Sequence, residues 1–491
     1  MNWRRSFSWL VAAACLGWAS TVAAEVKLPS IFGTAMVLQR DMPVPVWGTA
    51  AAGEDVKVTF AGQEKTAKAG TDGKWSVSLG KLTASAEGKS LVIAGSNTIT
   101  LENVLVGEVW ICSGQSNMEW GINGSLNADE MVKNATNPQI RAFNVGAHVT
   151  HALPQSDCPG AWRTCVPTHV AGFSAVGYFF GKRLQAELNV PVGLVQTAWG
   201  GTRIEPWISL QGFQSVPELK AQADEVAARD EKAKKKEAVS IDHNKPSAIY
   251  NAMIHPLVPF AARGAIWYQG ESNGNEGEEY FHKMTALING WRKDFNPDLA
   301  FYFVQLANFT QPNEDPAGGN EWAKLREAQR KTLTLPNTGM AVIIDIGEAG
   351  DIHPKNKQDV GWRLAQWALH QTYGKKNLVP SGPLYKGIEA KDGAIRLSFD
   401  NVGGGLMVGK KEGLNPTVAV PDGKLARFAI AGEDKKWFWA DAVIEGNRVV
   451  VKSKGVANPV AVRYGYQTNP TGANLYNKEG MPASPFRSDN W

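Results

Sequence analysis

The sequence predicts an α/β protein in which a parallel sheet covered by helices is flanked by two β-sandwich-like domains. In the middle third of the chain, apolar segments of strand length alternate with amphipathic helical segments, and such alternation implies a parallel sheet covered on both faces. On either side of this region, short β-prone runs are separated by turn residues. A chain of 491 residues also exceeds one ordinary hydrophobic core. We therefore predict domains at residues 25–104, 105–378 and 379–491.

Residues 1–24 have the pattern of a secretory signal peptide. Arg4 and Arg5 precede an apolar stretch over residues 7–18, and small residues at 22–24 offer a cleavage site. The apolar stretch is shorter than a membrane-spanning helix requires. We therefore expect an exported protein, periplasmic or extracellular, without stable insertion in a membrane.

The amino-terminal domain is predicted from strands that alternate apolar and polar residues between Gly and Asp-Gly turns. This pattern is typical of a small β-sandwich. The candidate strands are residues 42–48, 56–60, 75–79 and 90–93.

The central domain is predicted to have a parallel sheet whose strands alternate with helices. Five segments have the composition of buried strands: residues 108–112, 192–198, 264–268, 299–306 and 340–346. Amphipathic segments lie between or after them, at residues 173–188, 278–295, 322–333 and 358–373. Beyond residue 380 the pattern returns to strands, at residues 394–399, 437–439, 449–451 and 461–464. These last strands predict a second β domain or, alternatively, strands that complete the first β domain.

Composition narrows the class of ligand. The charges nearly balance, with 51 basic and 47 acidic residues, so nothing favours a nucleic-acid partner. Eighteen tryptophans weakly favour a carbohydrate ligand, because flat aromatic faces pack against sugar rings. No His-x-x-x-His or Cys-x-x-Cys pattern occurs, so we expect neither a metal site nor a cofactor. Cys158 and Cys165 are close enough in sequence to close a disulfide loop in an exported protein.

Polar clusters follow four of the five predicted central strands. They are Ser116 after the first, residues 199–203 after the second, residues 269–273 after the third and residues 350–354 after the fifth. The carboxyl ends of parallel strands emerge at one edge of a sheet, so these clusters can meet in one cleft.

If these clusters catalyse acyl transfer by a serine, several of their residues have a defined role. Ser116 is the candidate nucleophile, and His353 is the candidate base because it follows a long apolar strand and precedes a helix. Asp351 is the candidate acid that orients the imidazole, with Glu271 as the competing acid.

An oxyanion needs hydrogen-bond donors that are in place before the reaction. The backbone N–H groups of Ser116 and Gly201 are the candidates, together with a side-chain amide from either Gln269 or Asn273.

Trp120 and Arg203 are candidate substrate-binding residues, since an indole face and a guanidinium suit a sugar ligand. Either side chain could equally serve packing or ion pairing.

A second serine competes for the role of nucleophile. Residues 270–274 match the Gly-x-Ser-x-Gly pattern of α/β-hydrolases and would make Ser272 the nucleophile of a peptidase or lipase. That fold expects a helix to begin immediately, whereas residues 275–277 intervene. We therefore favour Ser116.

Several motifs of the chain occur together: Gly114-Gln115-Ser116-Asn117-Met118, residues 267–273, residues 301–307, Asp351-Ile352-His353-Pro354, and residues 472–477 and 483–487 in the tail. Their combination resembles the sialate O-acetylesterase family within the SGNH (GDSL-like) hydrolases. The resemblance covers nearly all of the chain that follows the signal peptide.

The resemblance implies a flavodoxin-like SGNH hydrolase domain flanked by β domains, and a metal-independent serine esterase that deacetylates O-acetylated sugars. It gives Ser116 the place of the nucleophile, His353 that of the base and Asp351 that of the acid. Sialic acids are the first expected substrate, with acetylated xylan as the alternative. A more distant alternative is a carbohydrate-binding protein without catalysis.

Overall fold

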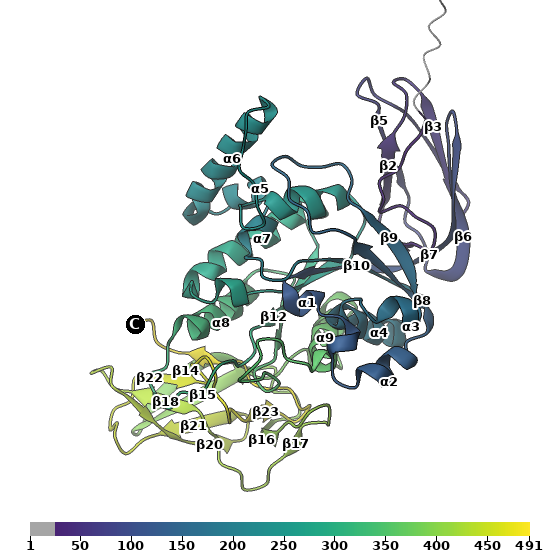
Figure 1. The fold of residues 1–491 in the computed structure, drawn as a ribbon. Coiled ribbons are helices and arrows are strands. Elements are labelled where there is room, and N and C mark those ends of the chain that lie inside the picture. The colour runs from purple at the N-terminus through teal and green to yellow at the C-terminus, as the bar shows by residue number, and fades with distance from the viewer. Residues whose placement is uncertain (1–24) are drawn as a thin grey trace, which may run out of the picture.

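Figure 1 shows a computed structural model of the protein, which describes residues 25–491. The predicted signal peptide, residues 1–24, lies outside the described residues. A central domain of sheet and helices separates an amino-terminal β domain, drawn in purple, from a carboxyl-terminal β domain, drawn in green to yellow. The predicted fold class, an α/β domain with flanking β domains, is confirmed.

The sheet of the central domain is mostly parallel. Its strand order is β13-β12-β11-β7-β10-β8-β9, and only β9 runs antiparallel to its neighbour. The strands are β7 (Thr98–Gly114), β8 (Asn137–Val145), β9 (Gly160–Cys165), β10 (Val192–Ala198), β11 (Gly264–Tyr268), β12 (Ala300–Gln305) and β13 (Thr338–Val342). All five predicted strands lie in this sheet. Strand β8 and the edge strand β9 were not predicted, because many of their residues are only half-buried and they lack an apolar run.

Helices cover both faces of this sheet (Figure 1). On one face Trp110 of β7 packs edge-on against Phe180 of α4, and on the other Trp267 of β11 packs edge-on against Trp291 of α7. The helices are α1 (Ser116–Glu119), α2 (Ala128–Lys133), α3 (Pro167–Val170), α4 (Ala175–Leu188), α5 (Leu210–Gln214), α6 (Lys220–Lys234), α7 (Tyr280–Asp294), α8 (Glu321–Lys331) and α9 (Lys357–Trp367).

Strand β7 belongs to two domains at once. Its first part pairs with β6 of the amino-terminal β domain, and its last seven residues, Glu108 to Gly114, pair with β10. The strand therefore crosses the boundary that we predict at residue 104. The other strands of this domain are β1 (Val37–Gln39), β2 (Val44–Thr49), β3 (Asp55–Phe60), β4 (Gln63–Lys68), β5 (Lys74–Leu79) and β6 (Ser85–Ala94).

The carboxyl-terminal β domain has a hydrophobic core of its own, whereas the other two domains share one continuous core. Its strands are antiparallel. They are β14 (Leu384–Lys391), β15 (Ala394–Asp400), β16 (Leu406–Lys410), β17 (Val418–Ala419), β18 (Phe428–Ala431), β19 (Trp437–Trp439), β20 (Asp441–Glu445), β21 (Arg448–Lys452), β22 (Ala461–Tyr464), β23 (Leu475–Asn477) and β24 (Phe486–Arg487).

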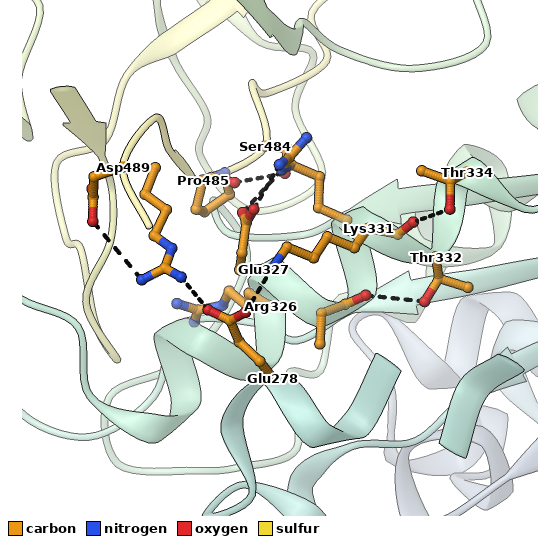
Figure 2. Close-up of polar contacts among 12 residues, drawn as sticks. Glu278, Arg326, Glu327, Lys331, Thr332, Thr334, Ser484, Pro485 and Asp489 are labelled. Atoms are coloured by element: carbon orange, nitrogen blue, oxygen red, sulfur yellow. Dashed lines mark hydrogen bonds and ion pairs between the residues drawn. The ribbon is translucent and has the colours of Figure 1, made fainter. Parts of the chain in front are cut away.

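Polar contacts join this domain to α8 of the central domain. Figure 2 shows the carboxylate of Glu278 facing Lys331 at the end of α8, at 2.6 Å. The same carboxylate accepts a hydrogen bond from Arg487 of β24. The tail of the chain is thereby held against the helix.

Candidate functional site

The end of β7 presents a hydroxyl at the carboxyl edge of the sheet. Gly114 has a φ of +138°, and a Cβ there would lie 2.1 Å from the carbonyl oxygen of Tyr268 in the neighbouring strand. Only glycine fits this close approach. Two residues later Ser116 begins the short helix α1 and is partly exposed among buried neighbours. Strand β7 lies between β10 and β11, which is the switch point where open α/β sheets bind ligands.

Ser116, His353 and Asp351 form a continuous chain of hydrogen bonds. The Oγ of Ser116 lies 2.9 Å from Nε2 of His353, and Nδ1 of His353 lies 3.2 Å from Oδ1 of Asp351. The same carboxylate oxygen accepts the backbone N–H of His353 at 2.9 Å. This backbone hydrogen bond and the contact with the imidazole lower the pKa of Asp351. An ionised Asp351 holds the imidazole with Nε2 free to accept the serine proton.

The competing acid, Glu271, lies elsewhere in the site. Its Oε1 accepts a hydrogen bond from Asn117 at 2.5 Å, and its Oε2 is buried without a partner. Burial raises the pKa of Glu271. The structure therefore brings Asp351, and not Glu271, to the imidazole of His353.

Trp120, a predicted substrate-binding residue, lies against the imidazole. Its ring stacks on His353 with centroids 4.8 Å apart and planes 20° apart. The indole therefore borders the reacting atoms and also limits how the imidazole can turn.

The loop that carries Gly201 lies beside Ser116. A Cβ at Gly200 would be 3.2 Å from Cβ of Ser116, while Gly201 is exposed and has a φ of +75°. The N–H of Gly200 is already bound, since it donates to Oε2 of Glu119 at 2.7 Å. The N–H of Ser116 opens α1, where a helix has no internal acceptor for it.

The two amides proposed as alternative oxyanion donors have their hydrogens engaged elsewhere. Nε2 of Gln269 donates to the carbonyl of Thr202 at 3.2 Å and to Oδ1 of Asn273 at 2.7 Å. Nδ2 of Asn273 donates to Glu205 at 3.1 Å and to Glu276 at 2.9 Å. In this structure both amides brace the loop that follows β10.

Arg203, the other predicted substrate-binding residue, takes part in the same network. Its guanidinium forms an ion pair with Glu276 and lies 3.2 Å from Glu205. Lys283, which is 5% exposed, contacts both carboxylates as well. Arg203 therefore holds the loop in place and has little free charge to offer a ligand.

Polar and aromatic side chains lie near Ser116, on α1 and on the loop after β10. His148 lies 2.8 Å from Glu119 and stacks on Trp199 with ring centroids 4.7 Å apart. His148 is exposed, and Glu119 and Trp199 are partly exposed. Indole and imidazole faces beside a carboxylate can contact the rings and hydroxyls of a sugar.

Ser272 has no imidazole within hydrogen-bonding reach among the described residues. It lies in a short helical turn, Glu271–Asn273, and its backbone N–H donates to Gln115 at 3.2 Å. The Nε2 of His353 is directed to Ser116 instead.

The cysteines of the described chain are free thiols. Cys158 and Cys165 are both buried and form no disulfide. Burial raises the pKa of Cys158 to about 12 and that of Cys165 to about 11.

No cluster of three or more His, Cys, Asp or Glu side chains suitable for a metal ion occurs among residues 25–491. No helix within that range is both long and apolar enough to cross a membrane.

Sequence reasoning missed three polar residues that support this site, Asn117, Glu119 and Lys357. Asn117 belongs to the motif Gly114-Gln115-Ser116-Asn117-Met118, but its role depends on partners more than 150 positions away in the sequence. Lys357 is fully buried, although lysine in a sequence normally indicates a solvated face.

A hydroxyl, an imidazole and a carboxylate in hydrogen-bonded order at the edge of a parallel sheet have the geometry that serine hydrolases use. Comparison with known proteins identifies the family of the chain. Residues 106–370 match the family model of carbohydrate esterases described as sialic acid-specific acetylesterase.

Relatives from animals and bacteria agree with this match. The chain is 30% identical to mouse sialate O-acetylesterase over 94% of both chains, and 29% identical to the human enzyme over 94% of this chain and 92% of that one. The crystal structure of a carbohydrate acetylesterase from Xanthomonas citri superposes with a TM-score of 0.83 and 39% identity, covering 95% of this chain and 100% of that chain.

The chain belongs to the sialate O-acetylesterase family. It is an esterase that acts on acetylated sugars.

Proposed function

We propose that Ser116, His353 and Asp351 form the catalytic triad of this esterase. The observation that carries the proposal is the unbroken series of contacts from the Ser116 hydroxyl through both ring nitrogens of His353 to the Asp351 carboxylate. The fold supports it, because the three residues lie at the ligand-binding edge of the parallel sheet.

The reaction proceeds in two acyl transfers. Oγ of Ser116 bonds to the acetyl carbonyl carbon while its proton moves to Nε2 of His353. The tetrahedral intermediate collapses, the bond to the sugar oxygen breaks, and the imidazolium returns the proton to that oxygen. Water then attacks the acetyl-serine, again with His353 as base, and releases acetate. Asp351 stabilises the imidazolium and stays ionised.

The oxyanion is held by backbone N–H groups in this proposal. The donors are the N–H of Ser116, at the start of α1, and the N–H of Gly201, in the loop after β10. Gln269 and Asn273 support the loop, since their amide hydrogens are already engaged.

We propose an O-acetylated sialic acid as the first candidate substrate, on the strength of the family. Acetylated xylan is the second candidate, and one observation favours it. Arg203 is paired with Glu276 and Glu205, and Glu119 adds negative charge next to the nucleophile. This arrangement disfavours an anionic sugar but does not disfavour a neutral one.

The signal sequence predicted for residues 1–24 supports export to the periplasm or the exterior. Detection of the mature chain outside the cytoplasm, starting near residue 25, is the direct test.

Acetate release from 9-O-acetyl sialic acid and from acetylated xylan, measured side by side, tests the substrate. Ser116→Ala should abolish both activities and labelling by a fluorophosphonate probe, while Ser272→Ala should keep a substantial share. Asp351→Asn should lower kcat by about 10⁴-fold, as loss of the orienting acid does in serine proteases. If Ser272→Ala is inactive and Ser116→Ala is not, the proposed mechanism is wrong.

A further inference from the structure

The side chain of Asn117 links the nucleophile to the segment that carries the base. Asn117 directly follows Ser116, and its Nδ2 donates a hydrogen bond to the carbonyl oxygen of Ile352 at 3.0 Å. Ile352 directly precedes His353. One amide therefore joins the backbone beside the hydroxyl to the backbone beside the imidazole.

A buried lysine sets the orientation of this amide. Lys357, the first residue of α9, is 0% exposed, and its ammonium donates to Oδ1 of Asn117. An ammonium has only donors, so Oδ1 must face it and both Nδ2 hydrogens must face away. These hydrogens reach Ile352 and, at 2.5 Å, Oε1 of Glu271.

Two aromatic rings of the site also contact Lys357. Its Nζ lies 5.8 Å from the ring centroid of Trp120 and 5.4 Å from that of Tyr268. Trp120 in turn stacks on His353. The indole thus lies close to both the ammonium and the imidazole, and its ring attracts the charged form of the lysine.

Burying a lysine away from a direct carboxylate partner is unfavourable for folding, and the proposed mechanism gives this one no chemical step. We propose that Lys357 is a positioning residue whose ammonium fixes Asn117, so that Asn117 holds Ser116 and His353 at their reactive separation. This inference rests on the roles proposed for Ser116 and His353.

Charged and titratable groups face Lys357 from every neighbouring element. Glu271 lies in the turn after β11, Tyr268 ends β11, and Asp351 and Glu348 precede His353. Burial lowers the pKa of Lys357 to about 7, against the raising effect of the three carboxylates. The ammonium is therefore lost as the pH rises above neutrality, and kcat should fall over the same range.

Lys357→Met tests the proposal, because methionine fills the same space without a charge or a donor. We expect kcat to fall on the order of 10²-fold, as for a small misplacement of reacting groups, with KM unchanged. The alkaline fall in kcat should disappear. Lys376→Met is the control, since that side chain is exposed and forms no hydrogen bond or ion pair with the described residues, and it should keep both kcat and the alkaline fall.

A double variant separates positioning from loss of structure. If Lys357 acts through Asn117, the combined Lys357→Met and Asn117→Ala variant should be no slower than Asn117→Ala alone. Additive losses would overturn the proposal, as would a Lys357→Met enzyme with unchanged kcat and pH profile. Should Lys357→Met not fold, Asn117→Ala must itself remove the alkaline fall, and its persistence overturns the proposal. An active Ser116→Ala enzyme would instead refute the proposed triad.

Discussion

The two β domains are attached to the central domain in different ways, and each attachment lies near a different half of the site. The amino-terminal β domain is joined by strand β7, which runs from that domain into the central sheet and ends just before Ser116. The carboxyl-terminal β domain has its own core; Leu384 of its β14 packs against the shared core, and polar contacts, some of them near His353, join it to the central domain.

The amino-terminal attachment is apolar, with one buried ionic group. Glu108, in the middle of β7, is 0% exposed. Its carboxylate lies 2.6 Å from Arg40 of the amino-terminal β domain and 3.0 Å from Arg263, which precedes β11. Since the two domains also share a core, we expect them to unfold together.

The carboxyl-terminal attachment depends on a buried arginine. Arg326 of α8 is 0% exposed and donates to four backbone carbonyls, two in each domain. They belong to Leu306, Ala307, Gln467 and Thr468. Burial without a carboxylate partner lowers the pKa of Arg326 to about 9.

Contacts of the same kind reach the segment that follows His353. Asn356 donates to the carbonyl oxygen of Gly413 at 3.0 Å, and Lys411 forms an ion pair with Asp359 at 2.7 Å. The comparison shows that Ser116 is positioned by a strand within a shared core, whereas the position of His353 depends in part on contacts between domains.

The largest effect on stability should come from Arg326→Ala. Hydrogen bonds from a charged donor contribute about 1.5–3 kcal/mol each, and the cost of burying the charge offsets part of that, so we expect a loss of about 5 kcal/mol. Calorimetry should then resolve two transitions, with the carboxyl-terminal β domain unfolding first. A single transition at the wild-type temperature would refute the proposed role of this arginine.

Glu108→Gln should have the next largest effect, about 3 kcal/mol, because it leaves two arginines without their buried partner. In contrast to Arg326→Ala, the loss should appear as one cooperative transition, measured by urea unfolding. Glu64→Gln is the control, since its pair with Lys57 is exposed and should contribute nothing measurable. Separate unfolding of the amino-terminal β domain in Glu108→Gln would contradict a shared core.

Most of the architecture follows from local sequence patterns. The central strands are mostly apolar runs, such as residues 192–198 and 264–268, and the structure has strands over the same residues. The helix predicted at residues 173–188 is observed as α4, Ala175–Leu188. Because the sheet is parallel, the carboxyl ends of the strands necessarily meet, which is why Ser116 and His353 could be paired from a separation of 237 positions.

The parts that could not be predicted depend on tertiary environment. Whether the amide of Gln269 faces the nucleophile or a neighbouring loop is decided by Thr202 and Asn273, and no local pattern encodes that choice. A buried Lys357 and an exposed Lys355 look alike in the sequence. Strand β8 alternates only weakly between buried and exposed residues, so no strand was predicted there.

Lys411→Met should have a smaller effect, confined to the contact near His353. The Lys411 side chain is 5% exposed and its partner Asp359 is 22% exposed. We therefore expect the free energy of unfolding to fall by about 1 kcal/mol, measured as a lower temperature of the first calorimetric transition. Lys410→Met is the matched control, because that neighbouring side chain is exposed and pairs only with Glu412. Equal effects of the two variants would mean that the contact with Asp359 does not hold the domain.

The smallest effect on stability should come from Asp351→Asn, although this variant should be the least active of the four. Hydrogen bonds from His353 lower the pKa of Asp351 in the folded protein. A lowered carboxyl pKa adds stability above the ordinary value of about 3.9, and that stability is lost as the pH falls through the folded-state pKa. The side chain is 37% exposed, so solvent screens most of the contribution.

The melting temperature of the wild type should therefore be slightly higher than that of Asp351→Asn between pH 5 and 7, and the difference should shrink below about pH 4. A difference that grows on acidification, or one larger than that of Lys411→Met, would show that Asp351 supports the fold rather than the imidazole alone.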